Sequence, residues 1–231
     1  MEFFEVVQKR RSIRRFTDEK VNPEAIEKAL QAALLAPTSS NAQTWDFYWA
    51  TKAETKKRLV YCCLNQSAAR TASDLIVVTA SPSAWRRSYP ALVQYALDVK
   101  APQMVIAYYT RLFPMMYRWG FMNSIGLIKK IIYFVTGLFS PIMRRPASLR
   151  DIQEICIKSS ALAAENFVLA MTAQGYSTCM MEGFDEVRVK KLLKLKKNDR
   201  VVMVIAVGHE AERGTWGPQF RMGSENFIHR I

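Results

Sequence analysis

Basic residues crowd around a single serine near the start of the chain. The stretch KRRSIRRF covers residues 9–16, and five of its eight residues are Lys or Arg. Like charges this close repel one another, so they need either full solvation or a shared anion. Guanidinium groups beside a hydroxyl suit a phosphate dianion. Arg10 and Arg14 would share one face if a helix formed by the first residues continued this far. The segment alone leaves both alternatives open, a solvated basic face and an anion site around Ser12.

A second polar cluster lies in the loop APTSSNAQTW, residues 36–45. Its hydroxyl and amide side chains offer donors and acceptors close together, which suits a planar heterocycle with imide edges. The alternative is an ordinary polar turn after a helix that Pro37 stops.

A third cluster is MMEGFDEVRVKKLL, residues 180–193. Gly183 would let the backbone approach a ligand closely, and Asp185 would cap the helix that follows. A plain turn is the alternative.

The elements that must position these clusters alternate between helix and strand. A helix capped by Asn22, with Pro23 at its first position, carries an apolar stripe as far as Ala33. A long helix is predicted over residues 151–178 and is ended by Gly175. Further helices are predicted at 52–64 and 186–195, and strands at 45–51, 74–81 and 201–210. This order predicts an α+β fold.

Length and charge limit the classes of function. A chain of 231 residues is long enough for one domain with a buried core, and its formal net charge of +13 favours anionic partners. No nucleic-acid-binding motif is visible, so nucleic acid is not expected as a partner. The cysteines lack metal-ligand spacing, and we expect reduced thiols in a cytoplasmic protein without a metal site.

Residues 84–150 have an unusual composition. They are apolar and aromatic, and residues 101–150 contain no Asp or Glu. The same fifty residues contain Arg111, Arg118, Lys129, Lys130, Arg144, Arg145 and Arg150. The longest apolar run is shorter than the roughly 20 residues of a transmembrane helix, so we do not expect a membrane span.

In their order and spacing, the three clusters together resemble the FMN-dependent nitroreductase family. The family's opening R-x-S-x-R-x-F pattern is matched by Arg10, Ser12, Arg14 and Phe16. Its P-S-S-x-N-x-Q-P-W pattern is matched by Pro37, Ser39, Asn41, Gln43 and Trp45, with departures at Thr38 and Thr44. The element E-G-F-D stands at residues 182–185, and a strand ending in Val207–Gly208 precedes the basic Arg221. These matches frame residues 1–81 and 151–222.

The resemblance implies one FMN-binding domain over residues 1–231, with a central, mostly antiparallel sheet flanked by helices. Residues 84–150 would form an atypical helical insertion or lid. FMN would bind without a covalent bond at the interface of a homodimer, and the chemistry would take place at flavin N5 without a catalytic side chain.

The resemblance also implies which residues bind the cofactor. Arg10, Arg11, Ser12 and Arg14 would hold the phosphate, the ribityl chain or the pyrimidine edge, and Arg221 would return to the phosphate. Pro37, Thr38, Ser39 and Asn41 would contact the flavin of the partner subunit. Asn65 would face the pyrimidine edge, and Glu182 and Gly183 would lie over the ring. One departure is Ala68, where the family has a basic residue; Arg70 is a candidate to replace that charge.

The implied activity is reduction of small flat acceptors such as nitroaromatics or quinones. NADH or NADPH would supply hydride in a two-electron, ping-pong course. Candidate lid residues are Tyr108, Tyr109, Phe113, Tyr117 and Trp119, and the alternative is that they pack the insertion itself. An alternative function is a flavoprotein or quinone reductase at the membrane surface, whose basic apolar insertion contacts anionic lipid.

Overall fold

Four antiparallel strands form the centre of the computed structural model, which describes residues 2–231. Their order across the sheet is β1-β2-β4-β3, with β1 at Trp45–Trp49, β2 at Asp74–Ala80, β3 at Ser177–Met181 and β4 at Arg200–Gly208. β1 pairs Trp45 with Ala80 of β2, and β3 pairs Ser177 with Gly208 of β4. The α+β class with an antiparallel sheet is therefore confirmed.

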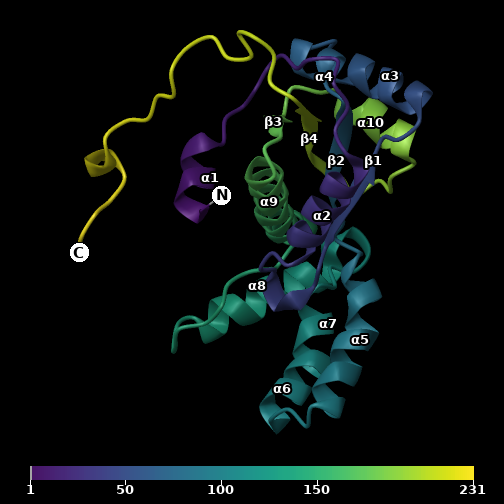
Figure 1. Ribbon diagram of the computed structural model, residues 1–231. Helices are drawn as coiled ribbons and strands as arrows, with labels where there is room; N and C mark the ends of the chain where they lie inside the picture. The colour runs from purple at the N-terminus through teal and green to yellow at the C-terminus, as the bar shows by residue number, and fades with distance from the viewer. Residues whose placement is uncertain (1) are drawn as a thin grey trace.

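Helices cover both faces of the sheet (Figure 1). Side chains alternate along a strand, so Ile76 and Val78 face α2 (Pro23–Leu34) and α9 (Leu149–Ala173), packing with Ile26 and Phe167. Leu75 and Val77 face the other side, together with α3 (Ala53–Cys62), α4 (Ser67–Thr71) and α10 (Glu186–Leu193). Because both faces are buried, β2 is apolar along almost its whole length.

Local capping signals mark the starts of α2 and α10. The Asn22 side chain accepts a hydrogen bond from the Glu24 amide at 3.0 Å, and Pro23 starts α2. Asp185 accepts from the Arg188 amide and caps α10, as predicted. α1 (Phe3–Lys9) does not continue to Arg14, so the helical face considered for Arg10 and Arg14 does not form. The helix predicted over residues 151–178 ends at Ala173, just before the predicted stop at Gly175 (φ 87°), and residues 177–178 belong to β3 instead.

The insertion forms a helical arm that projects from the sheet (Figure 1). Its helices are α5 (Trp85–Asp98), α6 (Gln103–Ala107), α7 (Phe113–Met116) and α8 (Ser124–Thr136), and a π-helical turn at Tyr108–Leu112 joins α6 to α7. Phe113 and Tyr117 are fully buried and pack edge-on against each other and near Trp85. They pack the insertion itself, so the lid role considered for these two residues is wrong.

One helix among residues 2–231 is long and apolar enough to cross a membrane by length and composition, namely α9. Half of its most apolar stretch is buried. It packs against α2 and the sheet through Ala164, Phe167 and Met171, which places it in the protein core.

Candidate functional site

The basic segment at residues 10–16 is extended and is attached to the edge of the sheet. The Ile13 amide donates to the Thr178 carbonyl at 2.9 Å, and the Arg14 amide donates to the Gly214 carbonyl at 2.7 Å. Ile13 and Phe16 are buried and anchor the segment in the core. Side chains alternate along extended backbone, so the side chains of Arg10, Ser12 and Arg14 lie on the same side of the segment although it is not helical.

These side chains line a cavity of about 300 Å³ together with residues 215–221 of the C-terminal segment. We call this cavity the arginine cradle; its charged lining residues are Arg10, Arg11, Arg14 and Arg221. Arg11 donates to the Gly217 carbonyl at 2.6 Å, which ties the two segments together. No carboxylate lines the cradle, and within residues 2–231 none of the four arginines forms an ion pair. Four unneutralised guanidinium groups around one cavity fit a phosphate dianion.

A second part of the site consists of two turns that meet beyond the end of β3. The first turn carries Asn65, with a left-handed φ of 53°, and Gln66; the second carries Glu182 and Gly183. The Gln66 side-chain amide donates to the Gly183 carbonyl at 2.5 Å and to the Cys63 carbonyl at 3.1 Å. A Cβ on Gly183 would lie 2.9 Å from the Gln66 side-chain nitrogen, so a side chain there would displace the Gln66 amide that joins the two turns.

Gln66 is a residue that the sequence interpretation missed. The only signal was its position directly after Asn65, and nothing in the sequence indicates that its side chain reaches a turn 117 residues away. Asn65, Glu182 and Gly183 are exposed, so the surface of these turns is open to a ligand.

The predicted loop at Pro37, Thr38, Ser39 and Asn41 lies at the opposite end of the sheet. It leads into β1, whose first residue pairs with Ala80 of β2, and Ala80 pairs with Arg200 of β4. The arginine cradle adjoins the other end of β4, where Gly208 pairs with Ser177. From Arg200 to Gly208 the strand extends roughly 27 Å. Within one chain, this loop therefore lies too far from the arginine cradle to contribute to it.

The insertion holds the same loop in place. The Tyr117 hydroxyl donates to the Ser39 carbonyl at 3.3 Å, and the Ser40 and Tyr108 hydroxyls lie 2.5 Å apart. Burial raises the pKa of the Tyr117 hydroxyl, so it remains a donor across the physiological range. Ser39 and Asn41 remain exposed on the outside of the loop.

Two further predicted positions differ in their surroundings. Ala68 is buried in the core beside α3, so this position presents no group to a ligand. Arg70 is exposed on α4, and within residues 2–231 it has no ion-pair partner.

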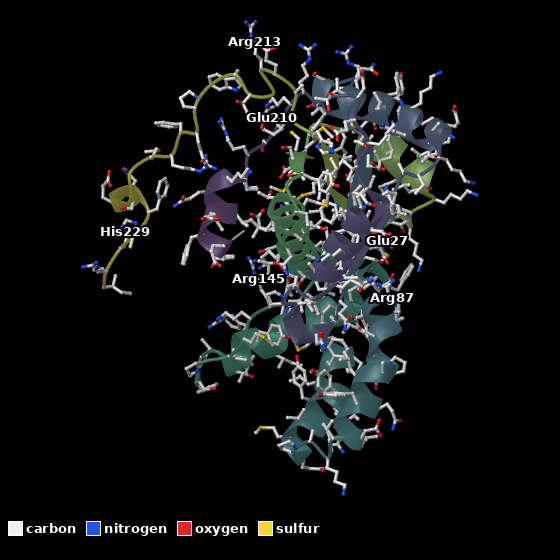
Figure 2. The ribbon with its side chains drawn as sticks, in the orientation of Figure 1. Glu27, Arg87, Arg145, Glu210, Arg213 and His229 are labelled. Atoms are coloured by element: carbon white, nitrogen blue, oxygen red, sulfur yellow. The ribbon has the colours of Figure 1, made fainter. Side chains whose placement is uncertain are left out.

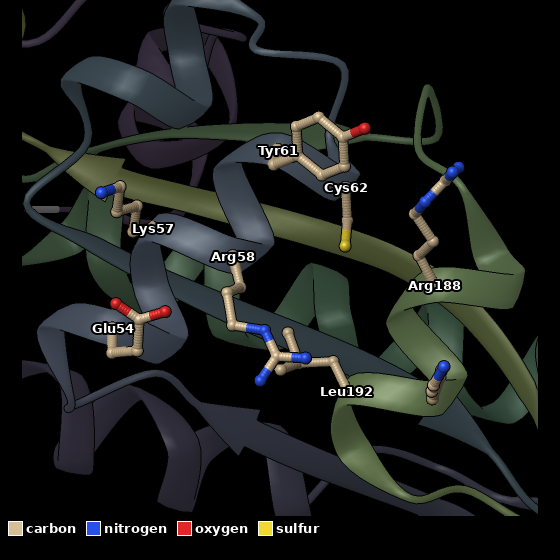
Figure 3. A pocket seen from close by; sticks show the side chains of 8 residues that line it. Glu54, Lys57, Arg58, Tyr61, Cys62, Arg188 and Leu192 are labelled. Carbon is tan, nitrogen blue, oxygen red and sulfur yellow. The ribbon is translucent and has the colours of Figure 1, made fainter.

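A separate cleft of about 490 Å³ lies between α3 and α10 (Figure 3). Lys57, Arg58, Arg188 and Lys191 contribute cations, and Tyr61, Cys62 and Leu192 contribute apolar surface. Arg188 is paired with Asp185, and burial, followed by the charge of Asp185, raises the pKa of the Cys62 thiol. None of the predicted cofactor-binding residues lines this cleft.

Comparison with known proteins settles the family. The family model described as "Nitroreductase family" matches residues 7–209, which include the basic segment, both turns and all four strands. The chain belongs to the nitroreductase family. This nitroreductase is 30% identical to Protein DrgA of Synechocystis over 213 residues, covering 92% of this chain and 86% of that protein. It is 21% identical to the oxygen-insensitive NADPH nitroreductase of Helicobacter pylori over 187 residues, covering 79% and 75% of the two chains.

The fold is also that of solved nitroreductases. A crystal structure from Exiguobacterium sibiricum, solved in complex with FMN, superposes with a TM-score of 0.73 at 21% identity, covering 100% of this chain and 98% of that chain. At this identity the likeness shows the fold. The predicted family, the fold class and the assignment as a nitroreductase-type oxidoreductase are confirmed.

Proposed function

We propose that this nitroreductase is an FMN-dependent cytoplasmic reductase, in which residues 1–231 form one cofactor-binding domain. It oxidises NADH or NADPH and reduces small flat acceptors such as nitroaromatics or quinones. The observation that carries the proposal is the arginine cradle, which gathers four guanidinium groups without a carboxylate. When bound, FMN supplies two-electron chemistry at N5 in alternating half-reactions.

The residues of the cradle and of the two turns divide the binding of FMN between them. Arg10, Arg14 and Arg221 neutralise the phosphate, while Arg11 and Ser12 supply further donors toward the phosphate and ribityl chain. Thr178, bonded to the basic segment, and Gly183 are five residues apart, so the two parts lie within roughly 17 Å of each other. A ribityl chain and a tricyclic ring can bridge that span. Asn65, Glu182 and Gly183 then face the ring.

We propose further that the protein is a homodimer in which the loop at residues 37–41 completes the partner's site. This loop lies too far from its own cradle, yet Ser39 and Asn41 are exposed. α1 and the C-terminal segment also expose large apolar side chains, among them Phe4 and Trp216 at 77% and 95% exposure. The C-terminal segment, with His229 near its end, extends away from the sheet (Figure 2). A second copy would cover these side chains.

The first test is the visible absorption spectrum of the purified protein, followed by the spectrum of the supernatant after heat denaturation. A flavin spectrum, with free FMN released on heating, supports the proposal, and the acceptors that reoxidise the reduced protein then define the substrate class. A colourless protein that also fails to take up added FMN would overturn it.

A further inference from the structure

α8 turns one of its two lysines inward and its large apolar residues outward. The Lys129 ammonium is buried and donates to the Met116 and Arg118 carbonyls at 2.9 and 2.7 Å. Gly126 lies on the same side, where a Cβ would meet the Ala147 carbonyl at 2.2 Å, and the Tyr133 hydroxyl donates to the Pro146 carbonyl. These three contacts on one side of α8 therefore fix the orientation of the helix about its own axis.

The opposite side of α8 is apolar and uncovered. Its six large apolar residues are between 50% and 64% exposed: Leu127, Ile128, Ile131, Ile132, Phe134 and Val135. Exposed apolar residues continue on either side of the helix, with Phe121 and Met122 before it and Leu138, Phe139 and Met143 after it. We call this surface the α8 patch. A surface helix of a globular protein normally has the reverse arrangement, with apolar residues toward the core.

The charged residues of the segment that carries the α8 patch, residues 101–150, are all basic. Residues 101–150 contain no carboxylate, and Lys130 and Arg144 are exposed beside the patch without an ion-pair partner among residues 2–231. Arg145, labelled in Figure 2, differs because it forms an ion pair at 3.1 Å with Glu154 of α9. The free cations therefore lie next to the apolar surface.

We propose that the α8 patch binds the surface of an anionic lipid bilayer. Large apolar side chains flanked by Lys and Arg are what an interfacial helix requires, and acidic headgroups complement the cations. A second copy of the same patch offers no carboxylate to these cations. This inference does not depend on the identity of the cofactor or of the electron acceptor.

The geometry places α8 in the plane of the membrane. Its thirteen residues extend about 20 Å, whereas a hydrocarbon core is about 30 Å thick. The arm projects from the body of the protein, so the patch can reach a flat surface without unfolding the sheet (Figure 1).

The test is co-sedimentation with vesicles of phosphatidylcholine containing about one third phosphatidylglycerol, compared with phosphatidylcholine alone. We expect the wild-type protein to sediment with the anionic vesicles at low salt, and to bind at least tenfold more weakly in about 0.5 M salt. Lys130→Glu combined with Arg144→Glu should weaken binding at least tenfold. Ile131→Ser combined with Phe134→Ser should abolish it.

Matched controls lie on the far side of the sheet. Lys57→Glu with Lys191→Glu changes the same number of charges, and Val187→Ser removes an exposed apolar side chain; both should bind vesicles as the wild type does. Thermal unfolding checks that each variant folds, and the charge variant tests the idea even if the serine variant does not fold. No sedimentation of the wild type at low salt would overturn the proposal. Wild-type dimers that do not bind vesicles but dissociate in the serine variant would show that the patch joins two copies instead.

Discussion

The Gln66 side chain joins the two turns of the site, since its amide donates to the Gly183 carbonyl at 2.5 Å and to the Cys63 carbonyl at 3.1 Å. A further bond between the same two segments runs from the Asp185 amide to the Cys62 carbonyl at 2.8 Å. Together these bonds fix the distance between Asn65 and Gly183, both of which are proposed to face the flavin ring.

Gln66→Ala should therefore weaken FMN binding about five- to tenfold, because loss of a hydrogen bond costs about 1 kcal/mol and frees the turn at Gly183. Titration of the apoprotein with FMN, followed by quenching of flavin fluorescence, measures the dissociation constant. Gln153→Ala is the matched control, since Gln153 also donates to a distant carbonyl, that of Asn198, away from the site. Equal affinities for the two variants would show that Gln66 does not position the turns.

Arg14→Ala should weaken FMN binding more strongly, by about ten- to a hundredfold, because a charge-assisted hydrogen bond contributes about 1.5–3 kcal/mol. The loss should be smaller for riboflavin, which has no phosphate. Arg15→Ala provides the control: Arg15 is the next residue in the same basic run and is exposed, but it does not line the cradle. If both substitutions leave FMN affinity unchanged, the basic segment is a solvated face and not a phosphate site.

Two variants that damage different parts of the site should complement each other if each site is shared between subunits, at an FMN concentration at which neither variant is active alone. Arg14→Ala damages the cradle, and Asn41→Ala damages the loop proposed to reach the partner. A mixed dimer would have one doubly altered site and one intact site. Random exchange of equal amounts should then restore about a quarter of wild-type activity. Activity no greater than the average of the two separate variants would place both residues in the site of one chain.

The pH dependence of stability should contain a contribution from Cys63. Burial, with a smaller effect of Cys62, raises the pKa of the Cys63 thiol from 9.0 to about 12. The folded protein keeps this proton while the unfolded chain loses it near pH 9, so the stabilisation is complete below pH 9 and is lost as pH rises toward 12. The slope should approach about 1.4 kcal/mol per pH unit.

Urea unfolding between pH 8 and about pH 11 measures this slope. Cys63→Ala should reduce the slope by up to about 1.4 kcal/mol per pH unit, which corresponds to the release of one proton. Val77→Ala, which truncates a buried residue of the same core cluster, should lower stability without changing the slope. The interpretation fails if the Cys63 variant keeps the wild-type slope.

Local sequence signals were sufficient to predict most of the helices and strands outside the insertion. Asn22 and Pro23 mark the start of α2, Asp185 caps α10, and the apolar run at 74–80 becomes a strand buried on both faces. β3 was missed because STCMM is short and follows a long helix without a strong break before Gly175. The aromatic residues of the insertion were ambiguous, since periodicity does not distinguish a substrate lid from a packed arm; burial of Phe113 and Tyr117 decides for packing.

The sequence by itself determined the family, the α+β class and the residue types that suit FMN, because these depend on patterns within short stretches. Only the tertiary structure decided which stretches meet. Pairing of the basic segment with Thr178 brings Arg14 toward Arg221, and Gln66 reaches Gly183 across 117 residues. Sheet register separates Asn41 from that cradle, and the contacts of Lys129 turn the apolar face of α8 outward. These relationships follow from long-range packing and strand register, which a linear pattern of residue types does not encode.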